Sequence, residues 1–224
     1  MDERDFVIVT IDGGAATGKS STARELSKRF NLLHVDTGAF YRTVTLALLR
    51  ADIDPSDPVA IEKALPELGI STRIVGRQAQ MEIDGAIPGE EIRDAKVNES
   101  VSLFAAHPAV RTYLLDYQRN QQEIARANGY PGLVMEGRDI GSVIFPDAEF
   151  RFFLVADDEE RMRRRAGQGQ TDSIRKRDKL DTERKTAPLR CPPNAITINT
   201  TSFPLDEVVE KISQKLDSKL PRIS

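Results

Sequence analysis

Short apolar runs recur along the chain and predict the strands of a buried sheet. Residues 6–11 (FVIVTI) and 133–136 (LVME) consist almost entirely of apolar and β-branched side chains. Short runs of this kind are typical of strands that are covered on both faces. The same pattern predicts further strands at 31–36, 150–156 and 195–201.

Between these runs the apolar residues are spaced three and four positions apart, which is the period of an amphipathic helix. In residues 19–30, Ala23, Leu26 and Phe30 fall on one face, while Arg24 faces water. The same spacing predicts helices at 39–50, 59–68, 90–106, 109–127, 157–165, 174–185 and 204–220. Strands that alternate with helices predict an α/β fold of three layers, with a central parallel sheet and right-handed crossovers.

One stretch departs from this alternation and predicts a β-hairpin. Residues 71–74 and 80–83 alternate apolar with polar side chains, with Gly76 between them and Asp84-Gly85 after them. This pattern is typical of two antiparallel strands. We expect one domain over residues 1–224, with an inserted small antiparallel subdomain at 68–93.

Composition places the chain among globular proteins without a strong charge bias. Hydrophobic residues make up 39% of the 224 positions, charged residues 30%, and the net charge is −3. This charge offers no overall attraction to nucleic acid or anionic lipid. No apolar run reaches the ~18 residues of a spanning helix, the start MDERD lacks a signal-peptide pattern, and the single Cys191 cannot form an internal disulfide. We therefore expect a cytoplasmic protein that binds neither membranes nor nucleic acid.

Residues 7–22 (VIVTIDGGAATGKSST) contain the pattern of a phosphate-binding loop, G-x-x-x-x-G-K-[ST], between a predicted strand and a predicted helix. A glycine-rich turn aims backbone N–H groups into one concavity, and the start of the helix adds its positive end. Lys19 would reach the β- and γ-phosphates, and the Ser20 hydroxyl would bind Mg²⁺. The pattern predicts a site for a nucleoside triphosphate and Mg²⁺, in preference to a chance glycine turn. Its residues are Gly13, Gly14, Ala15, Ala16, Thr17, Gly18, Lys19, Ser20 and Ser21.

Arginines accumulate near the expected ligand site. Because ligands of open α/β sheets bind beyond the carboxyl ends of the strands, residues 10–13, 36–38 and 136–139 should meet there. Guanidinium groups bind phosphate oxygens bidentately, and one triphosphate does not need this many of them. They predict two phosphorylated substrates that face each other. The arginines are Arg42, Arg111, Arg138, Arg177, Arg184 and the run at 161–165.

The two basic clusters near the C-terminal third could also be solvated helix faces or a patch for RNA. Glycines at 167 and 169 lie between the clusters, which favours a mobile arginine lid. No aromatic residues interleave the arginines, and the chain has no Trp, which argues against RNA.

Taken together, these motifs resemble the bacterial cytidylate kinases of the nucleoside monophosphate kinase family. The resemblance covers nearly the whole chain. It is carried by IDGGAATGKSS (11–21), DTGAFYR (36–42), GRDIGSVIFPDA (137–148) and RDKLDTERKTAPL (177–189). It implies a P-loop kinase fold in which the insertion at 68–93 binds the nucleoside monophosphate (NMP). It also implies a lid at 157–176, which is short here because only AGQGQTDS separates the two basic clusters.

The resemblance also implies a role for each matching residue. The loop at 13–21 would hold the phosphates of ATP, and Lys19, Arg42, Arg138 and Arg184 would be catalytic. The acceptor phosphate of CMP would lie among Arg42, Arg138 and Arg184. Further contacts would come from Thr37, Ser102, Arg111 and Asp139 to cytosine, from Arg177 and Asp181 to the sugar, and from Arg164 and Arg165 to ATP.

Direct in-line transfer fits these residues, because the acceptor phosphate is largely deprotonated at neutral pH and needs no general base. We expect His34 to pack or cap at a strand end and His107 to lie at a helix start. A carboxylate such as Asp139 accepts a hydrogen bond from the amino group of cytosine but repels the carbonyl of uracil, which predicts CMP and dCMP as substrates.

Two other functions stay open from the sequence. One is a kinase for a different acceptor, such as UMP, AMP or shikimate. The other is a nucleotide-binding switch, since residues 178–181 (DKLD) are similar to the guanine-reading [NT]KxD pattern, although no D-x-x-G motif is present. We expect the chain to be a monomer.

Overall fold

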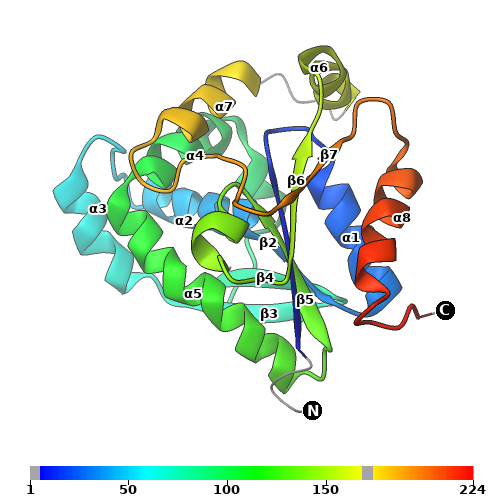
Figure 1. Cartoon of the computed structure of the whole chain (residues 1–224). Helices are drawn as coiled ribbons and strands as arrows, with labels where there is room; N and C mark the ends of the chain where they lie inside the picture. The colour runs from blue at the N-terminus through cyan, green and yellow to red at the C-terminus, as the bar shows by residue number, and fades with distance from the viewer. Residues whose placement is uncertain (1–5, 168–173, 224) are drawn as a thin grey trace.

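The computed structural model describes residues 6–167 and 174–223. It contains a central sheet with helices on both faces (Figure 1). The sheet has seven strands in the order β3-β4-β2-β5-β1-β6-β7, and every neighbouring pair is parallel except β3 and β4. The strands are β1 (Val7–Gly13), β2 (Leu33–Asp36), β3 (Ile70–Val75), β4 (Gln78–Ile83), β5 (Gly132–Gly137), β6 (Phe150–Val155) and β7 (Ile196–Asn199). The predicted α/β class is confirmed.

Helices connect the strands and form the outer layers. In Figure 1, α1 and α8 lie on one side of the sheet and α2, α4 and α5 on the other, while α6 and α7 lie near the upper ends of β1 and β6. The helices are α1 (Lys19–Phe30), α2 (Thr37–Arg50), α3 (Pro58–Ala64), α4 (Ala95–Ala106), α5 (Pro108–Ala127), α6 (Asp158–Gly167), α7 (Ile174–Glu183) and α8 (Leu205–Leu216). Short helical turns occur at η2 (Leu65–Glu67), η3 (Gly89–Arg93) and η4 (Ile140–Ile144).

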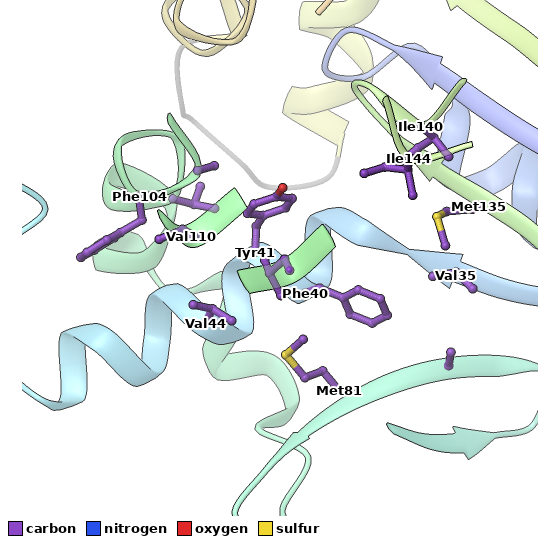
Figure 2. Close-up of a cluster of buried hydrophobic side chains, with 14 of the residues drawn as sticks. Val35, Phe40, Tyr41, Val44, Met81, Phe104, Val110, Met135, Ile140 and Ile144 are labelled. Carbon is purple, nitrogen blue, oxygen red and sulfur yellow. The ribbon is translucent and has the colours of Figure 1, made fainter. Parts of the chain in front are cut away.

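Two hydrophobic cores hold the three layers together. Because side chains alternate between the faces of a strand, neighbouring residues of β5 belong to different cores. Leu133 and Met135 belong to the same core as Phe40 of α2 on one face, and Val134 packs with Leu26 of α1 on the other. Figure 2 shows Met135 and Phe40 in the first of these cores. All five side chains are fully buried, and burying a side chain of this size contributes roughly 1.5–3 kcal/mol.

The predicted hairpin forms, but it is not a separate sheet. β3 and β4 pair antiparallel, and β4 also pairs in parallel with β2 through His34–Gln78 and Val35–Ala79. Ala79 and Met81 of β4 are buried in the core below α2. The hairpin therefore extends the central sheet, and the NMP-binding role of residues 68–93 stays a prediction.

Local chemistry explains where several helices begin and end. α2 begins at Thr37, two residues earlier than predicted, because the Asp36 carboxylate caps it by accepting from the N–H of Ala39 at 3.0 Å. α3 ends at Ala64 because Pro66 lacks an N–H, and a 3₁₀ turn follows. The predicted helix at 90–106 was wrong in its first turn, since the extended ψ of 157° at Asp94 separates η3 from α4.

The lid predicted at 157–176 includes residues 168–173, which lie outside the described residues, as does part of the predicted hinge at 167–169. α6 and the start of α7 form the described parts of this segment. Within the described residues, no helix is both long enough and apolar enough to cross a membrane.

Candidate active site

The predicted strand ends meet at one edge of the sheet. Asp36 at the end of β2 is in register with Glu136 of β5, and Asp12 of β1 is in register with Gly137. A cavity of about 950 Å³, counting the part open to solvent, lies beyond these ends. Its walls include twelve of the predicted site residues: Ala15, Ala16, Lys19, Ser20, Thr37, Arg42, Ser102, Arg138, Asp139, Arg165, Asp181 and Arg184.

The phosphate-binding loop joins β1 to α1 and depends on two glycines. Gly13 has φ +150°, and a Cβ there would lie 2.2 Å from the carbonyl oxygen of Leu154 on the neighbouring β6. Gly18 adopts the left-handed conformation, φ +94°, directly before the first residue of α1. These positions require glycine because a side chain at Gly13 has no space and L-residues rarely adopt such φ values.

Lys19 is buried at the bottom of this loop. Its Nζ donates to the carbonyl oxygen of Gly14 at 2.6 Å. Burial, and secondarily the positive charge of Arg138, lowers the pKa of Lys19 to about 7. A phosphate group beside Nζ would supply a negative charge and favour the protonated form.

Ser20 and Glu136 link the loop to β5. The Ser20 hydroxyl donates to Oε2 of Glu136 at 2.7 Å, and Nε2 of His34 lies 3.0 Å from Oε1. Burial opposes ionisation of Glu136, but His34, Lys19 and Ser20 together outweigh it and hold its pKa below the usual value. Burial, and then the charge of Glu136, raises the pKa of Asp36.

Asp12 is a site residue that the sequence reasoning missed. Its two carboxylate oxygens accept from the N–H groups of Ile140 and Gly141, each at 2.7 Å. Burial raises the pKa of Asp12 to about 6 in spite of these hydrogen bonds. The carboxylate fixes the segment that directly follows Arg138 and Asp139. Its position at the end of an apolar run, directly before the first glycine of the loop pattern, was the available signal.

Three arginines line the cavity, and a fourth, Arg111, pairs with Asp139 in its wall. Arg138 donates to Asp181 at 2.8 Å and to the carbonyl oxygen of Gly13 at 2.9 Å. Arg111 and Arg184 both donate to Asp139, the latter at 3.3 Å. Arg42 donates to the carbonyl oxygen of Ile92 at 3.0 Å.

This cluster contains four guanidinium groups and two carboxylates, so it keeps an excess of positive charge. Arg93 and Arg165 also line the cavity. A surface with this excess of guanidinium groups favours the binding of an anionic ligand.

The two arginines expected to cover ATP face different cavities. Arg165 lines the main cavity, whereas Arg164 lines a second cavity with Gly18, Phe203 and Pro204. Arg164 donates to the Thr200 carbonyl at 2.7 Å and to Glu160 at 2.8 Å. The Arg177 side chain lies outside the described residues.

Two further residues contact the phosphate loop: Asp178, which the sequence reasoning did not assign to the site, and Arg161, which it named only as part of the basic run at 161–165. Asp178 of α7 accepts from the N–H of Ala15 at 3.0 Å. Arg161 of α6 donates to the Ala15 carbonyl at 2.8 Å and forms an ion pair with Asp178. The sequence offered only the basic run at 161–165 as a signal, because these residues are distant along the chain.

Comparison with known proteins agrees with this geometry. The profile of the cytidylate kinase family matches residues 9–218. The chain belongs to the cytidylate kinase family. The resemblance inferred from the sequence motifs is thereby confirmed, and the chain is a kinase.

Curated relatives match over nearly their full length. The cytidylate kinase of Bacillus pumilus (strain SAFR-032) is 38% identical over 220 residues, covering 93% of this chain and 95% of that protein. The cytidylate kinase of Mycolicibacterium paratuberculosis is 39% identical over 217 residues, covering 92% and 93%. The cytidylate kinase of Geobacillus kaustophilus is 37% identical over 225 residues, covering 96% and 98%.

Solved structures support the fold of this family member. A sugar kinase from Janibacter sp. HTCC2649 superposes with a TM-score of 0.52 at 12% identity, covering 95% of each chain. At this identity the likeness concerns the fold alone.

Proposed function

We propose that the chain transfers the γ-phosphoryl group of ATP to CMP, and also to dCMP, giving CDP or dCDP and ADP. The observation that carries this proposal is one cavity whose walls include Lys19 together with Arg42, Arg138 and Arg184. ATP and CMP are both anionic and repel each other. These cations would offset this repulsion and align the two phosphate groups.

The transfer needs charge stabilisation more than proton transfer. The acceptor oxygen of CMP is already a nucleophile, since the second pKa of a phosphate monoester is about 6. Lys19 would bind the β- and γ-phosphates of the donor. Arg138 bridges the two sides, because it contacts both the carbonyl of Gly13 and Asp181, and it would stabilise charge on the phosphoryl group in transit.

Mg²⁺ fits the oxygen donors near the loop. Ser20 and Asp36 line the cavity and offer a hydroxyl and a carboxylate, which are ligands that a hard cation prefers. Within residues 6–167 and 174–223, no three His, Cys, Asp or Glu side chains are arranged to hold a metal by themselves. The cation would therefore be held jointly with the nucleotide phosphates, whose charge it would neutralise.

Asp139 would select cytosine. Arg111 and Arg184 fix its carboxylate from two directions, and Ser102 and Thr37 lie in the same cavity wall. A carboxylate held in this way accepts a hydrogen bond from the cytosine amino group and rejects the carbonyl of uracil. Asp181 and Arg177 would contact the sugar.

ATP would lie across the loop, with Arg164 and Arg165 over it. The second cavity adjoins Gly18 and Thr22, so it would accept the nucleoside part of the donor beside Phe203. We further propose a cytoplasmic monomer whose substrates are small nucleotides of pyrimidine metabolism, with no nucleic acid or membrane partner.

A coupled assay of ADP release tests the proposal. CMP and dCMP should support turnover with ATP and Mg²⁺, whereas UMP, AMP and shikimate should do so poorly. Preference for UMP or another acceptor would replace the proposed substrate. Tight GTP binding without any phosphoryl acceptor would favour a nucleotide-binding switch instead.

A further inference from the structure

A buried chain of hydrogen bonds connects β2, β5 and the start of α1. Nε2 of His34 lies 3.0 Å from Oε1 of Glu136, and the Ser20 hydroxyl donates to Oε2 at 2.7 Å. The side chains of His34 and Glu136 are only 4% and 3% exposed. Each carboxylate oxygen of Glu136 thus has its own partner, one on β2 and one at the end of the phosphate loop.

The position of His34 is not explained by packing alone. Its neighbours on β2, Leu33 and Val35, point into the core below α2. An apolar side chain at position 34 could fill buried space equally well, and burying an imidazole is costly unless it is hydrogen-bonded. The partner of this imidazole is a carboxylate that lines the cavity.

The arrangement determines how Ser20 presents its oxygen. A serine hydroxyl has one hydrogen, and Ser20 gives it to Glu136. The lone pairs of the Ser20 oxygen are then available to a cation. This orientation depends on the position of the Glu136 carboxylate. Asp36 is in register beside Glu136 and repels it when both carboxylates are ionised, so Glu136 needs partners that hold it in place.

We propose that His34 is a positioning residue for phosphoryl transfer, which holds Glu136 so that the Ser20 hydroxyl is oriented toward the divalent cation on the donor phosphates. The inference rests on the proposed use of ATP and Mg²⁺. His34 itself contacts neither group and acts through Glu136. Such supporting partners of metal ligands change metal affinity by about 10- to 100-fold when they are removed.

Three substitutions of His34 separate this role from a contribution to stability. His34→Gln places an N–H close to the position of Nε2, whereas His34→Asn is polar but too short to reach Glu136. His34→Leu fills the space without a donor. If the Leu variant does not fold, the Gln and Asn variants still test the role of His34, because both are polar and only Gln can reach Glu136.

Calorimetry of ATP binding to the full chain, without acceptor and with either MgCl₂ or EDTA, provides the measurement. The unmodified chain and the Gln variant should gain the same affinity from Mg²⁺. In the Asn and Leu variants, the increase in ATP affinity caused by Mg²⁺ should be about tenfold smaller than in the unmodified chain. Their ATP affinity in EDTA should equal that of the unmodified chain. In a Ser20→Ala background, His34→Asn should cause no further loss, because the two residues act through one carboxylate.

Equal Mg²⁺ dependence in the Gln, Asn and Leu variants would overturn the inference, even if their melting temperatures differ. A loss that persists in the Ser20→Ala background would also overturn it. If the unmodified chain does not bind ATP, the proposed function fails and the inference fails with it.

Discussion

The Asp178 carboxylate accepts a hydrogen bond of 3.0 Å from the backbone N–H of Ala15, inside the phosphate-binding loop. The two residues are 163 positions apart in the sequence. Backbone N–H groups of such a loop are the donors that bind phosphate. The carboxylate therefore lies where the negative charge of ATP would have to approach.

Asp178→Ala should increase the affinity for ATP by about 3- to 10-fold, because a hydrogen bond to a charged group no longer has to be displaced. The substitution also frees Arg161 from its ion pair. Fluorescence or calorimetric titration with ATP would measure the effect. The ATP affinity of Asp178→Asn, which keeps an acceptor but no charge, should fall between those of the unmodified chain and the Ala variant. The affinity for CMP should not change in either variant. Weaker ATP binding by the Ala variant would show that Asp178 supports the loop instead.

Asp139→Ala should reduce discrimination between CMP and UMP at least about tenfold, measured as the ratio of kcat/KM for the two acceptors. Its carboxylate would accept from the amino group that only cytosine has, and sites that hydrogen-bond a substrate group reject analogues strongly. The KM for ATP serves as the internal control, since the carboxylate of Asp139 pairs with Arg111 and Arg184. Full retention of the preference for CMP would exclude Asp139 from base recognition.

Arg138→Ala should lower kcat on the order of 10³-fold, by analogy with arginines that stabilise a phosphoryl group in transit. Arg138 is the arginine that contacts both the phosphate loop and Asp181. Arg190→Ala, at an exposed position, is the matched control and should leave kcat unchanged. A loss below tenfold in the Arg138 variant would show that this residue does not contact the moving group. Steady-state kinetics with saturating ATP and CMP would measure both variants.

ATP binding above pH 7 should be accompanied by proton uptake. In the free protein, burial lowers the pKa of Lys19 to about 7, so the amine is largely neutral at higher pH. Bound phosphate raises this pKa, and the affinity for ATP therefore falls as the pH rises past the free value. Calorimetry in buffers of different ionisation enthalpy would measure the uptake.

Lys19→Met should abolish that uptake, since it removes the titrating group. It should also stabilise the free protein most at low pH. Below pH 7 the folded state must bury a charged amine, and between about 7 and the ordinary value of 10.5 this cost disappears as the group deprotonates in the folded state. Urea unfolding at several pH values would reveal the trend. If ATP binding to the Met variant is still accompanied by proton uptake, a group other than Lys19 takes up the proton.

The local elements and much of their chemistry could be predicted from the order of the residues alone. The period of apolar residues located every strand of the sheet, and α1 spans the predicted residues 19–30. The glycine-rich loop could be identified because φ values such as +94° at Gly18 and the tight space at Gly13 are met by glycine alone. The capping role of His107, which accepts from the N–H of Ala109, likewise depends on neighbours in the sequence.

Which charged side chains lie next to one another depends on contacts between segments that are distant in the sequence. The pairing of Asp139 with Arg111 and Arg184 spans 28 and 45 residues, and that of His34 with Glu136 spans 102. The hairpin joined β2 because the core below α2 buries Ala79 and Met81. Periodicity shows which side of an element is buried, but the packing of helices against a particular strand order determines which polar side chain lies opposite another.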